Sequence, residues 1–282
     1  MKTNTLFHRI CIPVILIFFN VCNSYAYNPT SQHNYEDTLT IPPQDRIIYK
    51  TIDSTSLAME VFYPPNMVAG QKYPAIIFFF GGGWNGGSVQ QFEPHAMHFA
   101  RRGMIAIRAD YRVKSQHATT PFDAVEDAKS AIRFLRKNSE LLQIDTSRIA
   151  ASGGSAGGHL AAAAGTLKGL DNPAEDRSIS SRPNALILFT PVCDNGPGGY
   201  GYDRIGERYR EISPIHNIRE GTPPTIVFLG TKDRLIPVET ARTYKQKMEA
   251  AGSRCDLFLY EEQEHGFFNY SHSDNYQQTL KE

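Results

Sequence analysis

Apolar runs of strand length alternate with helical patterns along most of the chain. Residues 75–80 form an unbroken apolar run, as expected of a strand that helices cover on both faces. Shorter runs of the same kind, some of them with alternating polar residues, predict further strands. The expected strands are 46–51, 56–63, 75–80, 104–108, 148–152, 185–189, 225–229 and 256–260.

Helical patterns fill the intervals between the later strands. One helix is expected at about 90–102, and a second at about 120–142, where Thr120 can cap the helix and Pro121 suits its first position. A helix of small residues should run from Ser155 to Ala164, and another should begin near Pro237. This alternation predicts a three-layer α/β fold, with a mostly parallel eight-stranded sheet and helices on both faces. The stretches 169–184 and 191–224 show no clear periodicity, and loops of that length are usually functional or mobile.

The first 26 residues have the pattern of a secretory signal peptide. Lys2 and Arg9 precede an apolar run at 10–21, and Ser24-Tyr25-Ala26 has small residues at the two positions that a signal peptidase reads. The run is shorter than the roughly 20 residues that a membrane span needs. We therefore expect cleavage after Ala26 and a secreted or periplasmic protein.

The remaining chain, residues 27–282, suits one large domain better than two small ones. An uncleaved anchor or a buried first helix is the alternative reading of the N-terminus. Lipidation at Cys22 is a further alternative, although Val21 before it is not the small residue that a lipoprotein site prefers.

The balance of charges narrows the range of binding partners. Lys and Arg number 29 and Asp and Glu number 29, a formal net charge of 0 at pH 7, so neither nucleic acid nor stable membrane association after signal cleavage is expected.

Two cysteines of residues 27–282 are placed so that a disulfide between them is not expected. Cys193 follows the carboxyl end of one predicted strand, whereas Cys255 precedes the amino end of another. These ends lie on opposite sides of a parallel sheet, too far apart for the roughly 4.4–6.8 Å between disulfide Cα atoms. We expect two free, mostly buried thiols.

Candidate chemistry begins at Gly153-Gly154-Ser155-Ala156-Gly157, which matches G-x-S-x-G. The motif lies where a predicted strand gives way to a helix, the context in which it holds an exposed nucleophilic serine in a strained turn. The helix N-terminus then favours developing negative charge. The alternative is a Gly/Ala-rich helix start selected for close packing.

A nucleophilic serine needs a base, and His265 is the candidate. His265 follows the last predicted strand, as the order nucleophile, acid, histidine requires. His159 is a rival, but four residues after Ser155 it should point beneath the sheet and act as a packed, hydrogen-bonded residue. The remaining histidines are expected at the surface or in loops: His95, His98, His117, His216 and His272.

The orienting acid is expected to be Asp233, just past the strand at 225–229. Asp194, past the preceding strand, is the competitor. For the oxyanion of a tetrahedral intermediate, Gly81-Gly82-Gly83 offers backbone N–H groups that can approach the substrate closely. Ala156 adds the N–H that follows the nucleophile.

Together, Phe80-Gly-Gly-Gly-Trp84, Asp110-Tyr111-Arg112, Gly153-Gly-Ser-Ala-Gly-Gly158 and the Asp–His ending resemble the hormone-sensitive-lipase-like branch of the α/β-hydrolases. Within it, the chain is most similar to small secreted carbohydrate esterases of the acetyl-xylan and feruloyl esterase type. The resemblance covers essentially the whole of residues 27–282. It implies that Gly82, Gly83 and Ala156 are the oxyanion donors and that Asp110 is a structural support. Phe80 departs from the branch, which usually has His there, and Phe80 cannot hydrogen-bond the loop.

The sequence thus predicts a serine carboxylester hydrolase acting on short-chain, chiefly acetyl, esters of carbohydrates, with a small-molecule or polysaccharide ester as its partner. Trp84, Tyr200 and Tyr202 are expected to line an open cleft that stacks sugar rings. No cofactor and no metal are inferred, because no motif has their ligand spacing. The alternatives are a prolyl-oligopeptidase-like serine peptidase, a short-chain lipase or aryl esterase, and a non-catalytic binding module.

Overall fold

The computed structural model describes residues 43–282, so the signal-peptide prediction and Cys22 lie outside the described residues. Its strands are β1 (Asp45–Ile52), β2 (Thr55–Phe62), β3 (Tyr73–Phe79), β4 (Ile105–Ala109), β5 (Ile144–Gly154), β6 (Ala185–Phe189), β7 (Thr225–Gly230) and β8 (Cys255–Tyr260). Its α-helices are α2 (Glu93–Arg101), α3 (Lys114–His117), α4 (Pro121–Lys137), α5 (Ala156–Thr166), α6 (Tyr202–Ile205), α7 (Val238–Ala250) and α8 (Ser273–Thr279). The 3₁₀ helices are η1 (Val89–Phe92), η2 (Gly206–Glu211) and η3 (Pro214–His216).

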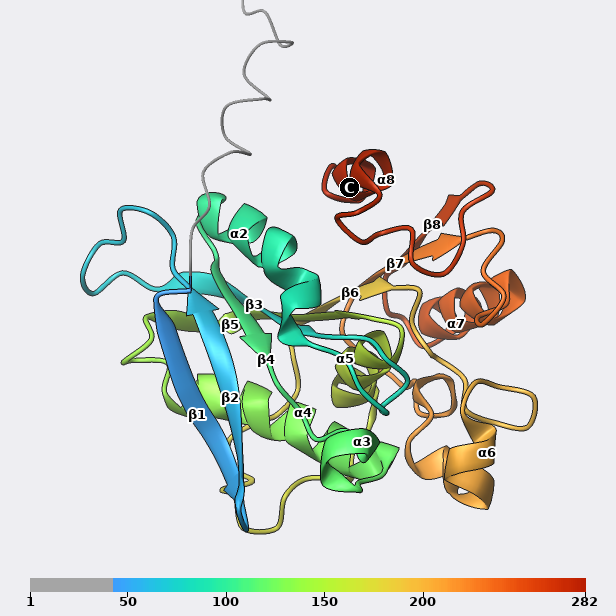
Figure 1. Ribbon diagram of the computed structural model, residues 1–282, viewed down its shortest axis with the longest axis horizontal. Coiled ribbons are helices and arrows are strands. Elements are labelled where there is room, and N and C mark those ends of the chain that lie inside the picture. The colour runs from blue at the N-terminus through green and yellow to red at the C-terminus, as the bar shows by residue number, and fades with distance from the viewer. Residues whose placement is uncertain (1–42) are drawn as a thin grey trace, which may run out of the picture. The chain divides into compact units, whose positions relative to one another are not determined.

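The strands form one 8-stranded sheet in the order β1-β2-β4-β3-β5-β6-β7-β8 (Figure 1). β2 runs antiparallel to both of its neighbours, and all pairs from β4 to β8 are parallel. The predicted mostly parallel eight-stranded sheet is therefore confirmed. Parallel β-strands end at one edge, so the loops after β3, β5, β7 and β8 lie together there.

Two apolar layers cover the faces of the sheet, because its central strands carry buried apolar side chains on both faces. On β3, Ile77 and Phe79 belong to the core beneath α4, α5 and α7, whereas Ile76 and Phe78 belong to the core beneath α2. α8 lies on the α2 side, where Tyr276 packs edge-on against His95 at 4.8 Å. This is the three-layer arrangement that the sequence predicts.

Two segments depart from the prediction. α4 ends at Lys137 instead of continuing to about residue 142, because the Asn138 side chain donates to the Phe134 carbonyl at 2.9 Å and the chain then turns into an early β5. Its start is as predicted, with the Asp123 carboxylate accepting from the Thr120 N–H at 2.8 Å. The segment 191–224 contains α6, η2 and η3, whose short lengths give no periodic signal.

Both cysteines of the described chain, Cys193 and Cys255, are free and buried, as expected. Burial raises the pKa of the Cys255 thiol to about 12.

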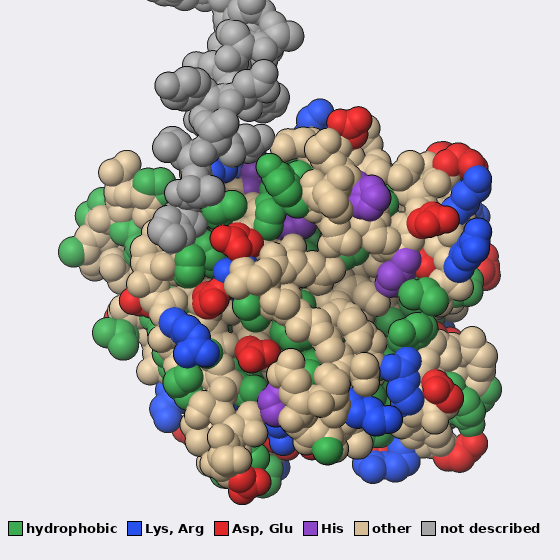
Figure 2. Space-filling model, viewed as in Figure 1, with side chains coloured by type: hydrophobic (Ala, Val, Ile, Leu, Met, Phe, Trp, Pro, Cys, Tyr) green, Lys and Arg blue, Asp and Glu red, His purple; other side chains and the backbone are tan. Residues whose placement is uncertain are grey.

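None of the helices between residues 43 and 282 combines the length and apolar character that a membrane crossing requires. Acidic and basic side chains intermix around the face shown in Figure 2.

Candidate active site

Ser155 occupies the sharp turn between β5 and α5, with φ 55° and ψ −119°. This region of backbone space is costly for a residue with a side chain and persists only where neighbours enforce it. The Ser155 N–H donates to the Phe189 carbonyl at 2.9 Å, and its carbonyl accepts from the His159 N–H at 2.9 Å. A Cβ atom on Gly157 would lie 2.0 Å from the Phe79 carbonyl oxygen, so this position requires glycine. The motif therefore forms the strand–turn–helix that its sequence predicts.

Asp233 and His265 meet at the edge of the sheet where β7 and β8 end. Nδ1 of His265 lies 2.7 Å from Oδ2 of Asp233, and the Asp233 side chain is fully buried. The other carboxylate oxygen accepts from the N–H groups of Leu235 at 2.8 Å and Ile236 at 2.9 Å. These hydrogen bonds hold the carboxylate in one orientation, which the backbone fixes.

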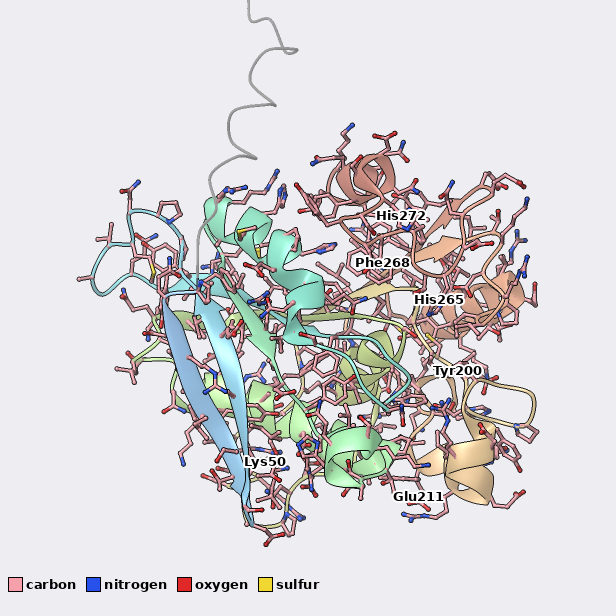
Figure 3. The ribbon with its side chains drawn as sticks, viewed as in Figure 1. Lys50, Tyr200, Glu211, His265, Phe268 and His272 are labelled. Atoms are coloured by element: carbon pink, nitrogen blue, oxygen red, sulfur yellow. The ribbon has the colours of Figure 1, made fainter. Side chains whose placement is uncertain are left out.

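The second imidazole nitrogen of His265 is the one that a proton transfer would use. Nε2 is buried and has no hydrogen-bond partner among residues 43–282, and it makes no hydrogen bond to the Ser155 hydroxyl. Catalytic hydrogen bonds are often long before substrate binds. Residues 261–272, the histidine loop, reach the serine turn through Phe268, whose ring lies 2.3 Å from where a Gly154 Cβ would be. Figure 3 shows His265 between Phe268 and Tyr200.

The rival residues have other partners. The Asp194 carboxylate accepts from the Gly196 N–H at 2.8 Å and faces His216 at 3.7 Å, whereas Nδ1 of His265 has Asp233 as its partner. His159 is fully buried and lies 3.1 Å from the Ile212 carbonyl through Nε2, as a packed, hydrogen-bonded histidine should. Burial lowers the pKa of His159 to about 4.

His95 differs from its prediction as a surface or loop residue. Its side chain is 0% exposed, among aromatic rings that include Phe92 at 5.0 Å and Phe189 at 5.3 Å. Burial lowers the pKa of His95 to about 3, with a smaller contribution from His98 in the same direction. The helical period placed His95 on α2, but a polar residue gave no signal that this was the inward face.

Two of the predicted oxyanion donors, Gly82 and Gly83, lie on residues 80–87, the oxyanion loop, which follows β3, and the third, Ala156, is the first residue of α5. The Gly81 N–H donates to Oε1 of Gln91 at 2.7 Å and is therefore occupied. The Gly82 and Gly83 N–H groups have no protein acceptor within the described chain, so they remain available. A Cβ atom on Gly81 would lie 3.3 Å from the Cβ of Ser155, which places this loop directly against the predicted nucleophile.

Phe80, where His is usual, is held by packing instead of a side-chain hydrogen bond. Its ring stacks on Tyr111 at 4.2 Å, and the Tyr111 hydroxyl donates to the Phe80 carbonyl at 2.8 Å. The Asp110 carboxylate accepts from the Tyr111 N–H at 2.9 Å, which supports the predicted structural role of Asp110. Burial raises the pKa of Asp110.

The prediction that Trp84 lines an open cleft is wrong. Its side chain is only 2% exposed, so it offers no ring face to a substrate. His159 packs edge-on against it at 5.0 Å, and the Arg204 guanidinium lies 5.3 Å from its ring. Arg204 also donates to the Gly83 carbonyl at 2.6 Å. Trp84 is therefore a support for the oxyanion loop.

Tyr200 and Tyr202 remain candidates for the cleft, since both are partly exposed. The Tyr200 ring lies beside Gly83, where an added Cβ would be 2.9 Å from its hydroxyl. A cavity of about 370 Å³ adjoins the same loop, and its lining includes Gly83, Trp84, Lys114, Asp203 and Arg204. Arg204 and Gln91 were not among the predicted site residues, because each has a partner far away in the chain, the Gly83 carbonyl for Arg204 and the Asn269 side chain for Gln91.

The chain matches two family models, BD-FAE over residues 59–195 and the dienelactone hydrolase family over residues 195–282. Its structure resembles the apo form of esterase 2 from Thermogutta terrifontis, with a TM-score of 0.82, 44% identity and coverage of 86% of this chain and 92% of that chain. The chain belongs to the hormone-sensitive-lipase-like esterases of the α/β-hydrolase superfamily.

Two further relatives of this α/β-hydrolase are longer proteins. Esterase LipC of Mycobacterium tuberculosis is 31% identical over 63% of this chain and 48% of its own length. An acetylxylan esterase of Xylanibacter ruminicola is 30% identical over 59% of this chain and 35% of its own length. The chain thus spans about half or less of these two relatives. The esterase relatives and solved structures support carboxylesterase activity.

Proposed function

We propose that the protein is a secreted or periplasmic carboxylesterase that removes short acyl groups, chiefly acetyl, from carbohydrates. One observation carries the proposal: a buried, backbone-held Asp233 contacts Nδ1 of His265, while Nε2 is left without a hydrogen-bond partner among residues 43–282. This arrangement fixes the imidazole tautomer with its basic nitrogen free. Ser155 lies in the strained turn at the same edge of the sheet.

In the proposed reaction, Ser155 Oγ attacks the ester carbonyl carbon and Nε2 of His265 takes the hydroxyl proton. The N–H groups of Gly82, Gly83 and Ala156 donate to the resulting oxyanion. His265 returns the proton to the leaving alcohol, and an acyl-enzyme remains on Ser155. Water then attacks the acyl-enzyme with His265 again as base, releasing the carboxylic acid and restoring Ser155.

Two comparisons support a short acyl group and a carbohydrate alcohol. The Thermogutta esterase has been solved with propionate and with butyrate bound. The Xylanibacter relative is an acetylxylan esterase by name. Polar residues on the cavity beside Gly83, among them Lys114 and Asp203, suit sugar hydroxyls. The signal-like pattern of residues 1–26 supports export to where polysaccharides are found.

The test is hydrolysis of p-nitrophenyl acetate by wild type and by Ser155→Ala. We expect kcat to fall by about 10³-fold or more, because loss of the nucleophile leaves only binding and the oxyanion donors. Ser152→Ala is the matched control, since the buried Ser152 hydroxyl on β5 has no hydrogen-bond partner in the described part of the chain and its loss should not affect turnover. Circular dichroism checks folding. If Ser155→Ala retained activity within tenfold of wild type, the assignment would be wrong.

Substrate class is tested separately by acetate release from acetylated xylan, beside hydrolysis of proline-containing peptide amides. The proposal expects release of acetate and no peptide cleavage. Cleavage of the amides without acetate release would favour a peptidase of the prolyl-oligopeptidase type instead.

A further inference from the structure

We propose that Gln91 is a positioning residue that ties the oxyanion loop to the histidine loop, an inference that rests on the proposed function. The Gly81 N–H donates to Oε1 of Gln91 at 2.7 Å. Nε2 of Gln91 donates to Oδ1 of Asn269 at 3.0 Å, and Nδ2 of Asn269 donates to the Gly266 carbonyl at 2.8 Å. One side-chain relay therefore joins the backbone beside the oxyanion donors to the residue that follows His265.

The backbone at both ends sets the direction of this relay. An N–H at Gly81 requires an acceptor, and the carbonyl at Gly266 requires a donor. A carboxamide carries one acceptor and one donor group on a rigid plane, so two carboxamides in series satisfy both ends. A carboxylate at position 91 could accept from Gly81 but could not donate to Asn269.

Apolar packing brings the two loops to this distance independently of the relay. Phe92, next to Gln91 on η1, stacks with Phe268, next to Asn269, at a centroid distance of 5.9 Å. Phe268 also stacks on Phe189 at 5.0 Å, and both Phe92 and Phe268 are buried. The hydrophobic contact therefore fixes the separation of the loops, while Gln91 restrains the N–H side of the peptide between Phe80 and Gly81.

The orientation of this peptide matters because of what Gly81 adjoins. A Cβ on Gly81 would lie 3.0 Å from the Gly154 carbonyl oxygen and 3.3 Å from the Cβ of Ser155. Rotation of this peptide would redirect the N–H groups of Gly82 and Gly83, which follow it. The Tyr111 hydroxyl holds the carbonyl of this peptide, which belongs to Phe80, at 2.8 Å, and Gln91 holds its N–H at 2.7 Å. The Phe80 side chain has no hydrogen-bonding group to add to these two restraints.

The test compares Gln91→Ala with Gln90→Ala, its matched control. Gln90 lies on the same 3₁₀ helix, but its side-chain oxygen accepts from Arg108 at 2.9 Å instead of from the N–H of Gly81. We expect Gln91→Ala to lower kcat on p-nitrophenyl acetate by about 10- to 100-fold, since misplacement by about 1 Å has effects of that size. KM should change by less than about threefold, and Gln90→Ala should stay within about twofold of wild-type kcat.

Two further measurements separate positioning from loss of structure. A trifluoromethyl ketone, which forms an oxyanion on serine, should bind Gln91→Ala more weakly in proportion to the loss of kcat, whereas butyrate inhibition should not change. Gln91→Glu keeps the acceptor for Gly81 and should fall between wild type and Gln91→Ala. Asn269→Ala combined with Gln91→Ala should be no worse than the worse single variant, because both break one relay.

The inference is overturned if Gln91→Ala keeps kcat within about twofold of wild type, if ketone and butyrate binding weaken equally, or if the double variant is fully additive. Ser155→Ala is measured beside these variants. An active Ser155→Ala would overturn the proposed function itself, whereas an inactive Ser155→Ala with a fully active Gln91→Ala would overturn only the role of Gln91.

Discussion

Asp233 reaches His265 with a carboxylate that its own loop holds in place. Oδ2 lies 2.7 Å from Nδ1 of the imidazole, while Oδ1 accepts two N–H groups two and three residues further along the chain. The side chain therefore cannot rotate away without breaking backbone hydrogen bonds in a fully buried position. Such an acid holds one imidazole tautomer and stabilises the imidazolium that forms during turnover.

The first prediction is that Asp233→Asn lowers kcat by about 10²- to 10⁴-fold. The amide oxygen would take the two backbone N–H groups, so the amide nitrogen would face Nδ1 and favour the wrong tautomer. Asp194→Asn, whose partners are Gly196 and His216, should stay within about threefold of wild type. The measurement is kcat on p-nitrophenyl acetate for both variants. If Asp194→Asn lowered kcat more than Asp233→Asn did, Asp194 would be the orienting acid.

A second prediction concerns Phe80→His, which restores the residue usual in this branch. The Phe80 ring is 2% exposed, stacks on Tyr111 and lies 2.4 Å from where a Gly87 Cβ would be. An imidazole there would be buried beside apolar atoms, so we expect the free energy of unfolding to fall by about 1–3 kcal/mol. We expect no gain in kcat. Urea unfolding and kcat at pH 8 are the measurements, and a gain in either would contradict this account.

The sequence was sufficient for the sheet because strand signals are local. Each apolar run needs only its own composition to be recognised, and the strand–helix alternation then leaves few topologies. The motif around Ser155 is equally local, since the turn, the nucleophile and the close-packed glycines fall within five residues. Asp233 and His265 were predicted from their places after consecutive strands, which the parallel sheet brings to one edge.

Hydrogen bonds between a side chain and a group far away in the chain are beyond such reasoning. Gln91 meets Asn269 across 178 positions, and Arg204 meets Gly83 across 121. Nothing in the local pattern of either residue marks its partner. Trp84 was misplaced for a related reason: an aromatic residue beside a glycine run suits a cleft or a core equally well, and only the packing of His159 and Arg204 decides between them.

The third prediction uses the buried neutral His95. Burial, with a smaller effect of His98, lowers its pKa to about 3 in the folded state, whereas an unfolded histidine titrates near about 6.5. As the pH falls below about 6.5, His95 takes up a proton in the unfolded chain before it does so in the folded chain. The contribution of neutral His95 to the free energy of unfolding is therefore complete above that pH and is lost as the pH falls towards 3. Between pH 7 and pH 5, this one residue should lower the free energy of unfolding by about 2 kcal/mol.

His95→Phe should therefore reduce the loss of stability between pH 7 and pH 5 by about that amount, since a ring of similar size fits the same aromatic cluster. Urea unfolding at the two pH values measures the effect. His272→Gln, at an exposed position, is the control and should follow wild type. Equal acid sensitivity of His95→Phe and wild type would show that His95 is not buried in its neutral form.

The last prediction is a preference for short acyl chains. A long acyl tail gains about 0.8 kcal/mol for each methylene only where an apolar surface buries it. Trp84, which could have formed such a surface, is already covered by His159 and Arg204. The segment between β6 and β7 presents charged side chains on its short helices, among them Asp203, Glu207 and Arg208.

With charged helices beside the site and no apolar gain for added methylenes, octanoate and decanoate esters should be poorer substrates than acetate and butyrate. We expect kcat/KM for p-nitrophenyl acetate and butyrate to exceed that for the octanoate by about tenfold or more, because methylenes left in water add no affinity while a longer chain is harder to orient. The four p-nitrophenyl esters are compared below their micelle-forming concentrations. If octanoate or decanoate were preferred over acetate, the site would have to contain an apolar channel, and the enzyme would be closer to a lipase.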